Sequence, residues 1–191
     1  AVAYLTRFYK ADAGVVISAS HNPVEYNGIK YFNREGYKVP DAMEDEIESL
    51  LDDSNQLIES PTGSGVGRIK TKDGARPYID FIKSVSDKDL SGLTIALDCA
   101  NGAAYKVAPI IFEELGAKVH VINNESDGSN INVNCGSTHP EALCQFVKEV
   151  GADVGLAFDG DADRLIAVDD KGQIVDGDKI MYICAKHLKE Q

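Results

Sequence analysis

Two short loops of this sequence carry side chains whose types and spacing are suited to phosphate and metal chemistry. The first is the segment Ser18-Ala19-Ser20-His21-Asn22-Pro23, which directly follows an apolar, β-branched run. Strand ends in α/β folds often carry reactive side chains, and Ser20 would be exposed there. An ordinary polar turn ending at Asn-Pro explains the same residues equally well. A serine hydrolase is disfavoured, because Ser20 is in no Gly-x-Ser-x-Gly elbow and cannot pair well with the adjacent His21.

The second loop is the segment Phe158-Asp159-Gly160-Asp161-Ala162-Asp163-Arg164, again after an apolar run. Its alternating carboxylates would repel one another if they turned to one side without a counter-charge. A hard divalent cation, Mg²⁺ or Ca²⁺, removes that repulsion, because both prefer oxygen ligands. An EF-hand is excluded, since Arg164 occupies the position that requires glycine and strand-like sequence flanks the loop. A solvated acidic turn remains the alternative, but the apolar runs on both sides favour a metal site.

The two loops complement each other chemically. Three Asp ligands leave the coordination sphere of Mg²⁺ incomplete, and phosphate and water usually complete such spheres. A phosphorylated Ser20 would supply a phosphate oxygen, and Arg164 could hold a second phosphate with two hydrogen bonds. The formal net charge of −12 argues against nucleic acid or an anionic membrane as partner. An anionic substrate would therefore need the local positive charge of a metal and Arg164.

The elements that must position these loops alternate between strands and helices. The chain has 191 residues and is 43% apolar, which is enough for a packed core. Apolar periodicity predicts strands at 14–18, 28–32, 93–97, 118–122, 153–158, 165–168 and 173–175. It predicts helices at 1–10, 41–51, 77–84, 104–115, 140–150 and 178–189. The order indicates an α/β fold with a largely parallel sheet.

Residues 52–76 form a polar, Gly-rich stretch that we interpret as a linker near a domain boundary. The glycine run at 63–67 is no Gly-x-Gly-x-x-Gly motif and precedes no helix signal, so a phosphate cradle is disfavoured. No apolar run approaches the roughly 20 residues that cross a bilayer, and the first residues lack the pattern of a signal peptide. Because the sequence does not begin with Met, we expect a truncated or processed piece.

The cysteines are Cys99, Cys135, Cys144 and Cys184, which are far apart and form no Cys-x-x-Cys pair. We interpret them as small buried thiols of a reducing cytosol, with disulfides or metal as the alternative. The expected location is therefore cytoplasmic.

Together, the two loops resemble those of the α-D-phosphohexomutase superfamily. The segment 16–23, followed by Asn27-Gly28-Ile29-Lys30, is similar to the family's phosphoserine loop, and 159–164 is similar to its metal loop. Further similar stretches are 98–102, 135–141, 165–169 and 176–178. Within the superfamily, the residues of these stretches are most similar to the bacterial phosphoglucosamine mutase branch. The similarity covers essentially the whole chain.

The resemblance implies an α/β fold of two mixed domains and the start of a third, out of four in the family. Residues 1–70 would be the later part of the first domain, 71–175 the second, and 176–191 the opening helix of the third. Sugar-reading and phosphate-binding loops of the later domains would be absent. We therefore expect this polypeptide alone to bind metal and to retain the serine that can be phosphorylated, but not to catalyse the mutase reaction.

The resemblance also implies roles for individual residues. Ser20 would carry the transferable phosphoryl group, and Asp159, Asp161 and Asp163 would bind Mg²⁺ together with a phosphate oxygen on Ser20. Lys30 would assist proton transfer at the sugar hydroxyl, although an exposed lysine at a strand end is its simpler interpretation. Arg164 and His21 would contact the reacting phosphate, and His21 is equally well explained as a loop hydrogen-bonder.

The implied reaction moves phosphate between C6 and C1 of glucosamine phosphate through a bisphosphorylated sugar. A phosphosugar would then be the partner, with no nucleic acid and no membrane, and the oligomeric state stays open. The rival interpretations are a phosphomannomutase or phosphoglucomutase, and a non-catalytic module that binds a divalent metal. Three histidines are assigned no role, and two aromatic residues are assigned to a helix core. They are His120, His139 and His187, and Tyr105 and Phe112.

Overall fold

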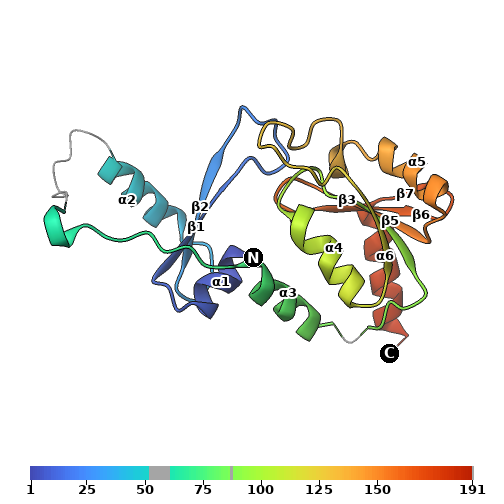
Figure 1. Cartoon of the computed structure of the whole chain (residues 1–191), viewed down its shortest axis with the longest axis horizontal. Helices are drawn as coiled ribbons and strands as arrows, with labels where there is room; N and C mark the ends of the chain where they lie inside the picture. Colours follow the sequence, from blue (N-terminus) through green and yellow to red (C-terminus); the bar gives the residue numbers. More distant parts are fainter. Residues whose placement is uncertain (52–60, 87, 191) are drawn as a thin grey trace. The chain divides into compact units, whose positions relative to one another are not determined.

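The computed structural model describes residues 1–51, 61–86 and 88–190, which form two compact units (Figure 1). The first unit comprises Ala1–Val16 and Ile29–Tyr78, and the second comprises Ile17–Gly28 and Ile79–Gln191. The loop that contains Ser20 thus belongs to the same unit as the loop that contains the three aspartates.

The first unit is built around a two-stranded sheet of β1 (Ala13–Ser18) and β2 (Gly28–Asn33), of which Ile17, Ser18 and Gly28 are counted with the second unit. Helix α1 (Val2–Phe8) packs closely against β1 at Gly14, where a Cβ would collide with the hydroxyl of Thr6. The first unit also contains α2 (Asp41–Leu51), the short 3₁₀ turn η1 (Gly63–Gly65) and the start of α3 (Ala75–Ser84).

The second unit contains a five-stranded sheet in the order β4-β3-β5-β6-β7. Its strands are β3 (Thr94–Asp98), β4 (Lys118–Ile122), β5 (Val154–Phe158), β6 (Leu165–Asp169) and β7 (Ile174–Val175). Strand β3 pairs in parallel with β4 and β5, whereas β6 pairs antiparallel with both β5 and β7. The expectation of a largely parallel sheet is therefore wrong at this edge. The short connection 159–164 cannot make the crossover that a parallel neighbour needs, so β6 returns antiparallel.

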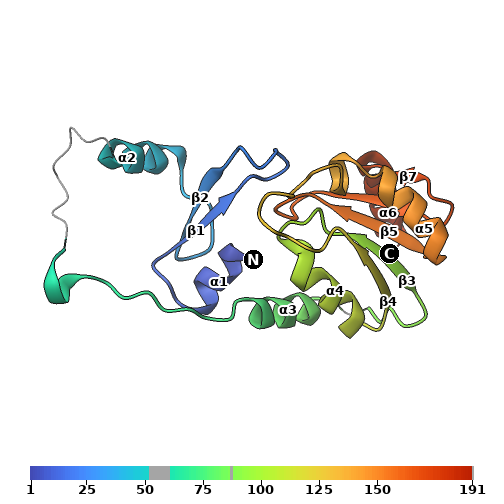
Figure 2. The same ribbon diagram turned by 45° about the horizontal axis from the view of Figure 1, so that its top comes forward.

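Helices cover both faces of this sheet, as Figure 2 shows for α4 (Ala104–Glu114) and α5 (Glu141–Val150). Alternate residues of β3 point to opposite faces. Ile95 and Leu97 pack with residues of α4, while Ala96 packs with Leu143 and Val147 of α5. Helix α5 approaches closely because β5 has Gly155, where a Cβ would press into the side chain of Val147. The two cores fix the carboxyl ends of β3 and β5, which carry the candidate site.

The chain also contains the short 3₁₀ turn η2 (Gly136–Thr138) and the final helix α6 (Gly177–Lys189). Asp176 caps α6, since its side chain accepts a hydrogen bond from the Lys179 amide at 2.9 Å. Among the described residues, no helix combines the length and the apolar character that crossing a bilayer requires.

Most predicted elements agree with the structure, and the differences have simple causes. The predicted helix 77–84 begins two residues earlier at Ala75, because Pro77 is tolerated in a first helical turn. Within the predicted linker 52–76, residues 63–65 form η1, and residues 52–60 lie outside the described residues. Tyr105 and Phe112 pack against the core as expected.

The expectation of buried thiols is correct for only part of the cysteines. Cys99 and Cys135 are buried, and this burial raises the pKa of Cys99 to about 12 and that of Cys135 to about 11. Cys144 is half-buried, and Cys184 is exposed on α6. The exposed position of Cys184 contradicts the expectation, because α6 presents this face to solvent in the described chain.

Candidate functional site

Ser20 and the aspartate loop meet in the second unit. Ser20 follows the end of β1 and has a left-handed backbone conformation with φ of 52°. Its amide donates a hydrogen bond to the Ser18 hydroxyl at 2.9 Å. Its own hydroxyl donates to Oδ1 of Asp161 at 3.3 Å, although the two residues are 141 positions apart in the chain. The fold therefore brings together the two loops that the sequence singled out.

The loop 159–164 gathers three carboxylates at the turn between β5 and β6. One oxygen each of Asp159, Asp161 and Asp163 lies within 4.8 Å of the others. Oδ1 of the buried Asp159 accepts hydrogen bonds from the amides of Asp163 and Arg164, both at 3.1 Å. Oδ2 of Asp159 is also buried and has no hydrogen-bond partner within the described chain. A clustered set of oxygen ligands that includes one unsatisfied buried oxygen fits a hard divalent cation.

The electrostatics of this cluster favour a cation as well. Burial raises the pKa of the Asp159 carboxyl, the hydrogen bond from the Arg164 amide opposes this, and repulsion from Asp161 and Asp163 raises the pKa further. The ionised form of Asp159 is thus disfavoured by its surroundings. A positive ion at the cluster would reverse that preference, because an opposite charge stabilises a carboxylate.

Two further predicted residues lie beside the loops. The Arg164 side chain is 55% exposed, and its Nε lies 3.9 Å from Oδ2 of Asp159 and 3.9 Å from Oδ1 of Asp163. The guanidinium thus lies at the edge of the acidic cluster, on a side chain that is partly exposed. Nδ1 of His21 lies 3.4 Å from the Ser20 hydroxyl oxygen. His21 thus lies beside the Ser20 hydroxyl, and Arg164 lies beside two of the three clustered carboxylates.

Lys30 lies on β2 in the first unit and is half-buried. Because it belongs to the other unit, its role remains a prediction. The other histidines differ in their surroundings. His120 contacts Phe146 edge-on, with ring centroids 6.4 Å apart, whereas His139 lines a cavity of about 320 Å³ together with His21.

Three residues that sequence reasoning did not select support this site. Asp98, fully buried at the end of β3, accepts hydrogen bonds from the amides of Ala100 and Gly136, both at 2.9 Å. Asn132 donates from its side-chain amide to the carbonyl oxygens of Ser20 and Asn22, at 2.8 Å and 3.1 Å. Gly160, the third, has no room for a side chain, because a Cβ there would collide with the Ser20 carbonyl oxygen.

The backbone around the site is unusual in its conformation. Several non-glycine residues have positive φ, a region that ordinary side chains rarely adopt. Within the second unit they include Ser20, Ala100, Asn101, Asn132 and Ala162, with φ between 48° and 60°. Such conformations persist only where surrounding contacts hold them, and they concentrate at functional sites. The alternation Asn130-Ile131-Asn132-Val133-Asn134 was the available signal, since Asn tolerates left-handed backbone best after Gly.

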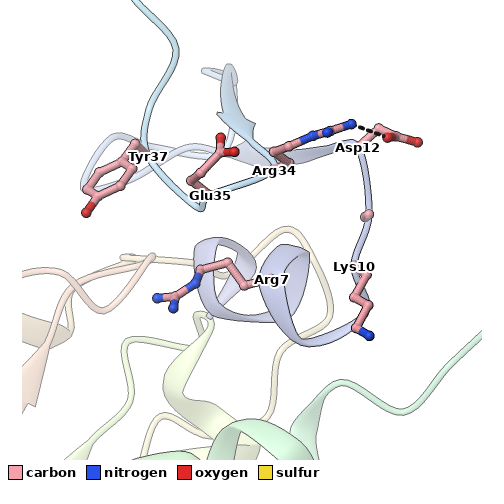
Figure 3. Close-up of a pocket in the computed structure, with 7 residues that line it drawn as sticks. Arg7, Lys10, Asp12, Arg34, Glu35 and Tyr37 are labelled. Atoms are coloured by element: carbon pink, nitrogen blue, oxygen red, sulfur yellow. Dashed lines mark hydrogen bonds and ion pairs between the residues drawn. The ribbon is translucent and has the colours of Figure 1, made fainter.

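A second cavity, of about 600 Å³, lies in the first unit and is lined by both cations and anions (Figure 3). Arg34 is directed to Asp12, with which it forms an ion pair at 2.8 Å. Arg7 and Lys10 point away from that pair and away from each other (Figure 3). Because the cationic groups do not converge, this cavity is not a built anion site.

Two family models match the chain. Residues 1–57 match the phosphoglucomutase/phosphomannomutase alpha/beta/alpha domain I, and residues 76–172 match alpha/beta/alpha domain II of the same family. These matches cover both loops of the candidate site.

Individual proteins agree with the family models. The chain is 62% identical to the phosphoglucosamine mutase of Clostridium novyi over 192 residues, which is 100% of this chain and 43% of that protein. It is 62% identical to the phosphoglucosamine mutase of Acetivibrio thermocellus, over 100% of this chain and 42% of that protein. A solved phosphoglucomutase/phosphomannomutase family protein from Burkholderia thailandensis has a TM-score of 0.72 at 30% identity, over 93% of this chain and 38% of that one. The chain thus spans less than half the length of the curated relatives it matches.

Proposed function

This chain belongs to the phosphoglucomutase/phosphomannomutase family, and we propose that it is the phosphoserine- and metal-binding part of a phosphoglucosamine mutase. The whole enzyme would interconvert glucosamine 6-phosphate and glucosamine 1-phosphate in the cytoplasm. The identity of 62% to two phosphoglucosamine mutases over the full length of this chain supports that choice within the family.

The observation that carries the proposal is the contact between Ser20 and the acidic cluster. The Ser20 hydroxyl lies 3.3 Å from Oδ1 of Asp161, which is one of three carboxylates clustered within 4.8 Å. A phosphoryl group on Ser20 would place its anionic oxygens beside these carboxylates. That arrangement is strongly repulsive without a cation and favourable with one. The geometry therefore supports a site in which a metal and a phosphoserine depend on each other.

Asp159, Asp161 and Asp163 would hold Mg²⁺, with an oxygen of the phosphorylated Ser20 as a further ligand. When bound, Mg²⁺ supplies positive charge that stabilises the phosphoryl oxygens during transfer. Oδ1 of Asp159 holds the loop through two backbone amides, which leaves Oδ2 for the ion. All the proposed protein ligands are oxygens, which suits Mg²⁺ rather than a softer metal.

The protein residues would divide the transfer step among them. A sugar hydroxyl oxygen forms a bond to phosphorus while the bond from phosphorus to Oγ of Ser20 breaks, which leaves a serine alkoxide that takes up a proton. Arg164 would bind the moving phosphoryl group, and His21, 3.4 Å from the Ser20 oxygen, would contact it as well. Lys30 would assist proton transfer at the attacking hydroxyl, and it could accept that proton only as the neutral amine. The second half-reaction returns a phosphoryl group from the bisphosphorylated sugar to Ser20.

A phosphomannomutase or phosphoglucomutase is the second candidate, because the family's name includes both activities. A non-catalytic module that binds a divalent metal is the third, and the acidic cluster alone would support it. Both kinds of mutase require a phosphorylated Ser20 and differ in the sugar that they convert, whereas a metal-binding module requires neither a phosphoserine nor a sugar.

The test uses a chimera in which this sequence replaces the matching segment of the Clostridium novyi phosphoglucosamine mutase. We expect the chimera to convert glucosamine 6-phosphate, and we expect intact-mass analysis to find one phosphate that maps to Ser20. The variant Ser20→Ala should lose both, whereas Ser64→Ala, at an exposed residue of η1, should keep both. A chimera that folds but neither turns over nor gains phosphate would reject the mutase and leave the metal module. The choice of sugar is then measured on the full-length polypeptide that contains this sequence.

A further inference from the structure

We infer that Asn132 is a positioning residue for phosphoryl transfer, because its side-chain amide holds the Ser20 loop against the metal loop. The inference rests on the proposed function of Ser20. It assigns no contact with the phosphate to Asn132 and concerns only where the Ser20 oxygen is held.

The first step of the argument is the pair of hydrogen bonds from one amide group. The side-chain nitrogen of Asn132 donates to the carbonyl oxygen of Ser20 at 2.8 Å and to that of Asn22 at 3.1 Å. These two carbonyls lie on either side of His21, so one amide fixes the turn that carries Ser20 and the predicted phosphate contact His21. An amide NH₂ group has two donors, and both are used here.

The second step is the conformation that these bonds hold. Ser20 has a φ of 52°, which a serine rarely adopts unless its surroundings impose it. This conformation sets the direction of the Ser20 side chain, whose oxygen lies 3.3 Å from Oδ1 of Asp161. If the carbonyl of Ser20 were released, its backbone would relax to an extended conformation and turn the hydroxyl away from Asp161.

The third step is the anchoring of Asn132 itself. Its backbone amide donates to the Ala100 carbonyl at 3.0 Å, and the Ala100 amide donates to the buried carboxylate of Asp98 at 2.9 Å. Asp98 is the last residue of β3, an interior strand that pairs with β4 on one side and β5 on the other. A continuous set of hydrogen bonds therefore connects the rigid end of β3 to the Ser20 loop.

The fourth step is the closeness of the metal loop to the same contact. A Cβ added at Gly160 would collide with the Ser20 carbonyl oxygen and would come within 2.8 Å of the Asn132 side-chain nitrogen. The carbonyl of Ser20, the amide of Asn132 and the backbone of Gly160 thus pack directly against one another. Because Gly160 separates Asp159 from Asp161, Asn132 holds Ser20 relative to both proposed ligands.

Asn134 offers a matched control on the same loop. It has nearly the same backbone conformation, with φ of 51° against 60° for Asn132, but it is exposed, and the carbonyls of Ser20 and Asn22 accept from the side chain of Asn132 instead. Glycine adopts positive φ without strain, so Asn132→Gly and Asn134→Gly both remove a side chain from a left-handed position. The two variants differ in whether the hydrogen bonds to Ser20 and Asn22 are lost.

The experiment measures both variants in the Clostridium novyi chimera. We expect Asn132→Gly to lower kcat by about 10- to 100-fold, with KM and the Mg²⁺ concentration for half-maximal activity changed by less than about twofold. The rate at which a sugar 1,6-bisphosphate phosphorylates Ser20 should fall in parallel, while Asn134→Gly keeps the values of the parent. A merely structural role would instead lower Tm and the folded yield, and would leave kcat per folded molecule unchanged. That result would overturn the inference.

A second readout separates this inference from the proposed function. In this chain itself, Mg²⁺ is titrated while the backbone amide resonances of Ser20 and Asp161 are followed by NMR. We expect Mg²⁺ to shift both resonances in the parent and in Asn134→Gly, but only that of Asp161 in Asn132→Gly. An equal shift of the Ser20 resonance in all three proteins would reject the positioning role, whether or not the chimera turns over. An inactive parent chimera would reject the proposed function alone.

Discussion

At the scale of single residues, Asp159 shows how one carboxylate serves two purposes. Its Oδ1 holds the turn by accepting hydrogen bonds from the amides of Asp163 and Arg164, and its Oδ2 stays buried without a hydrogen bond in the described chain. A buried carboxylate oxygen without a hydrogen bond is unfavourable, and two neighbouring carboxylates add repulsion that Arg164, with its Nε 3.9 Å from Oδ2, offsets only in part. We therefore expect a cation bound at this loop to raise the stability of the fold.

Asp161→Asn tests this balance, because it removes one charge and keeps an oxygen that can accept from Ser20. Without metal, we expect the free energy of unfolding to stay the same or to rise by up to about 1 kcal/mol, since a repulsive charge is lost. With Mg²⁺ at about 100 times its Kd, the parent should gain about 2.7 kcal/mol and the variant markedly less. Urea unfolding with Mg²⁺ and with EDTA measures both quantities.

The control for that comparison is Asp170→Asn, at an exposed position in the turn between β6 and β7. It removes the same charge outside the cluster, so its gain from Mg²⁺ should equal that of the parent. Equal gains for the parent and for Asp161→Asn would show that the metal binds elsewhere.

At the scale of elements, the ends of β3 and β5 and the turn after β1 form one supporting structure. Left-handed backbone at Ser20 and at Asn132 costs on the order of 1–3 kcal/mol for each residue. Each hydrogen bond from the Asn132 side chain contributes about 1 kcal/mol. These contributions are of similar size, so the strained turn depends on the sheet end that anchors Asn132.

Asp98→Asn tests how β3 supports this structure. Burial raises the pKa of the Asp98 carboxyl, while hydrogen bonds from Ala100, Gly136 and Asn123 lower it by less. Because the folded protein then holds this proton more tightly than the unfolded chain, stability falls as pH rises from the ordinary value of about 3.9 through the raised one. Asn lacks this titration but leaves one backbone amide facing its NH₂ group, which costs about 1–3 kcal/mol.

We therefore expect the cost of Asp98→Asn to shrink as pH rises through that interval and to stay constant above it. Urea unfolding of the parent and the variant at a series of pH values measures this cost. A cost that grows with pH would mean that the hydrogen bonds to Asp98 outweigh its burial.

Some of these elements could be predicted from the sequence, and others could not. Apolar periodicity located β3, α4, β4 and α5 to within about two residues, because each buries one face or stripe. It did not predict that β6 runs antiparallel, since pairing depends on the length of the connection. Residue types and their spacing identified the loops of Ser20 and Asp161. Local sequence patterns cannot predict that two residues 141 positions apart are in contact. Asp98 and Asn132 were missed because both act on backbone atoms.

At the scale of the whole molecule, charge and length constrain what the chain can do alone. A net charge of −12 repels a phosphosugar at long range, so positive charge must be concentrated where phosphate binds. Arg164 and a metal would supply it at the Ser20 site. The chain covers only 43% of the Clostridium novyi enzyme, so more than half of that enzyme's length has no counterpart in it.

This leads to a prediction for the chain in isolation. We expect it to bind Mg²⁺ in calorimetry, and we expect Asp161→Asn to weaken that binding markedly. In a coupled assay we expect no conversion of glucosamine 6-phosphate above the blank.

Efficient phosphoryl transfer needs the sugar held in line with Ser20, and correct positioning contributes up to about 7–11 kcal/mol to lowering such a barrier. The residues that we propose around Ser20 would hold the phosphoryl group and the metal, and we assign none of them to the sugar ring. Turnover by the isolated chain at a rate near that of the chimera would contradict this, and would mean that the Ser20 site alone orients the sugar.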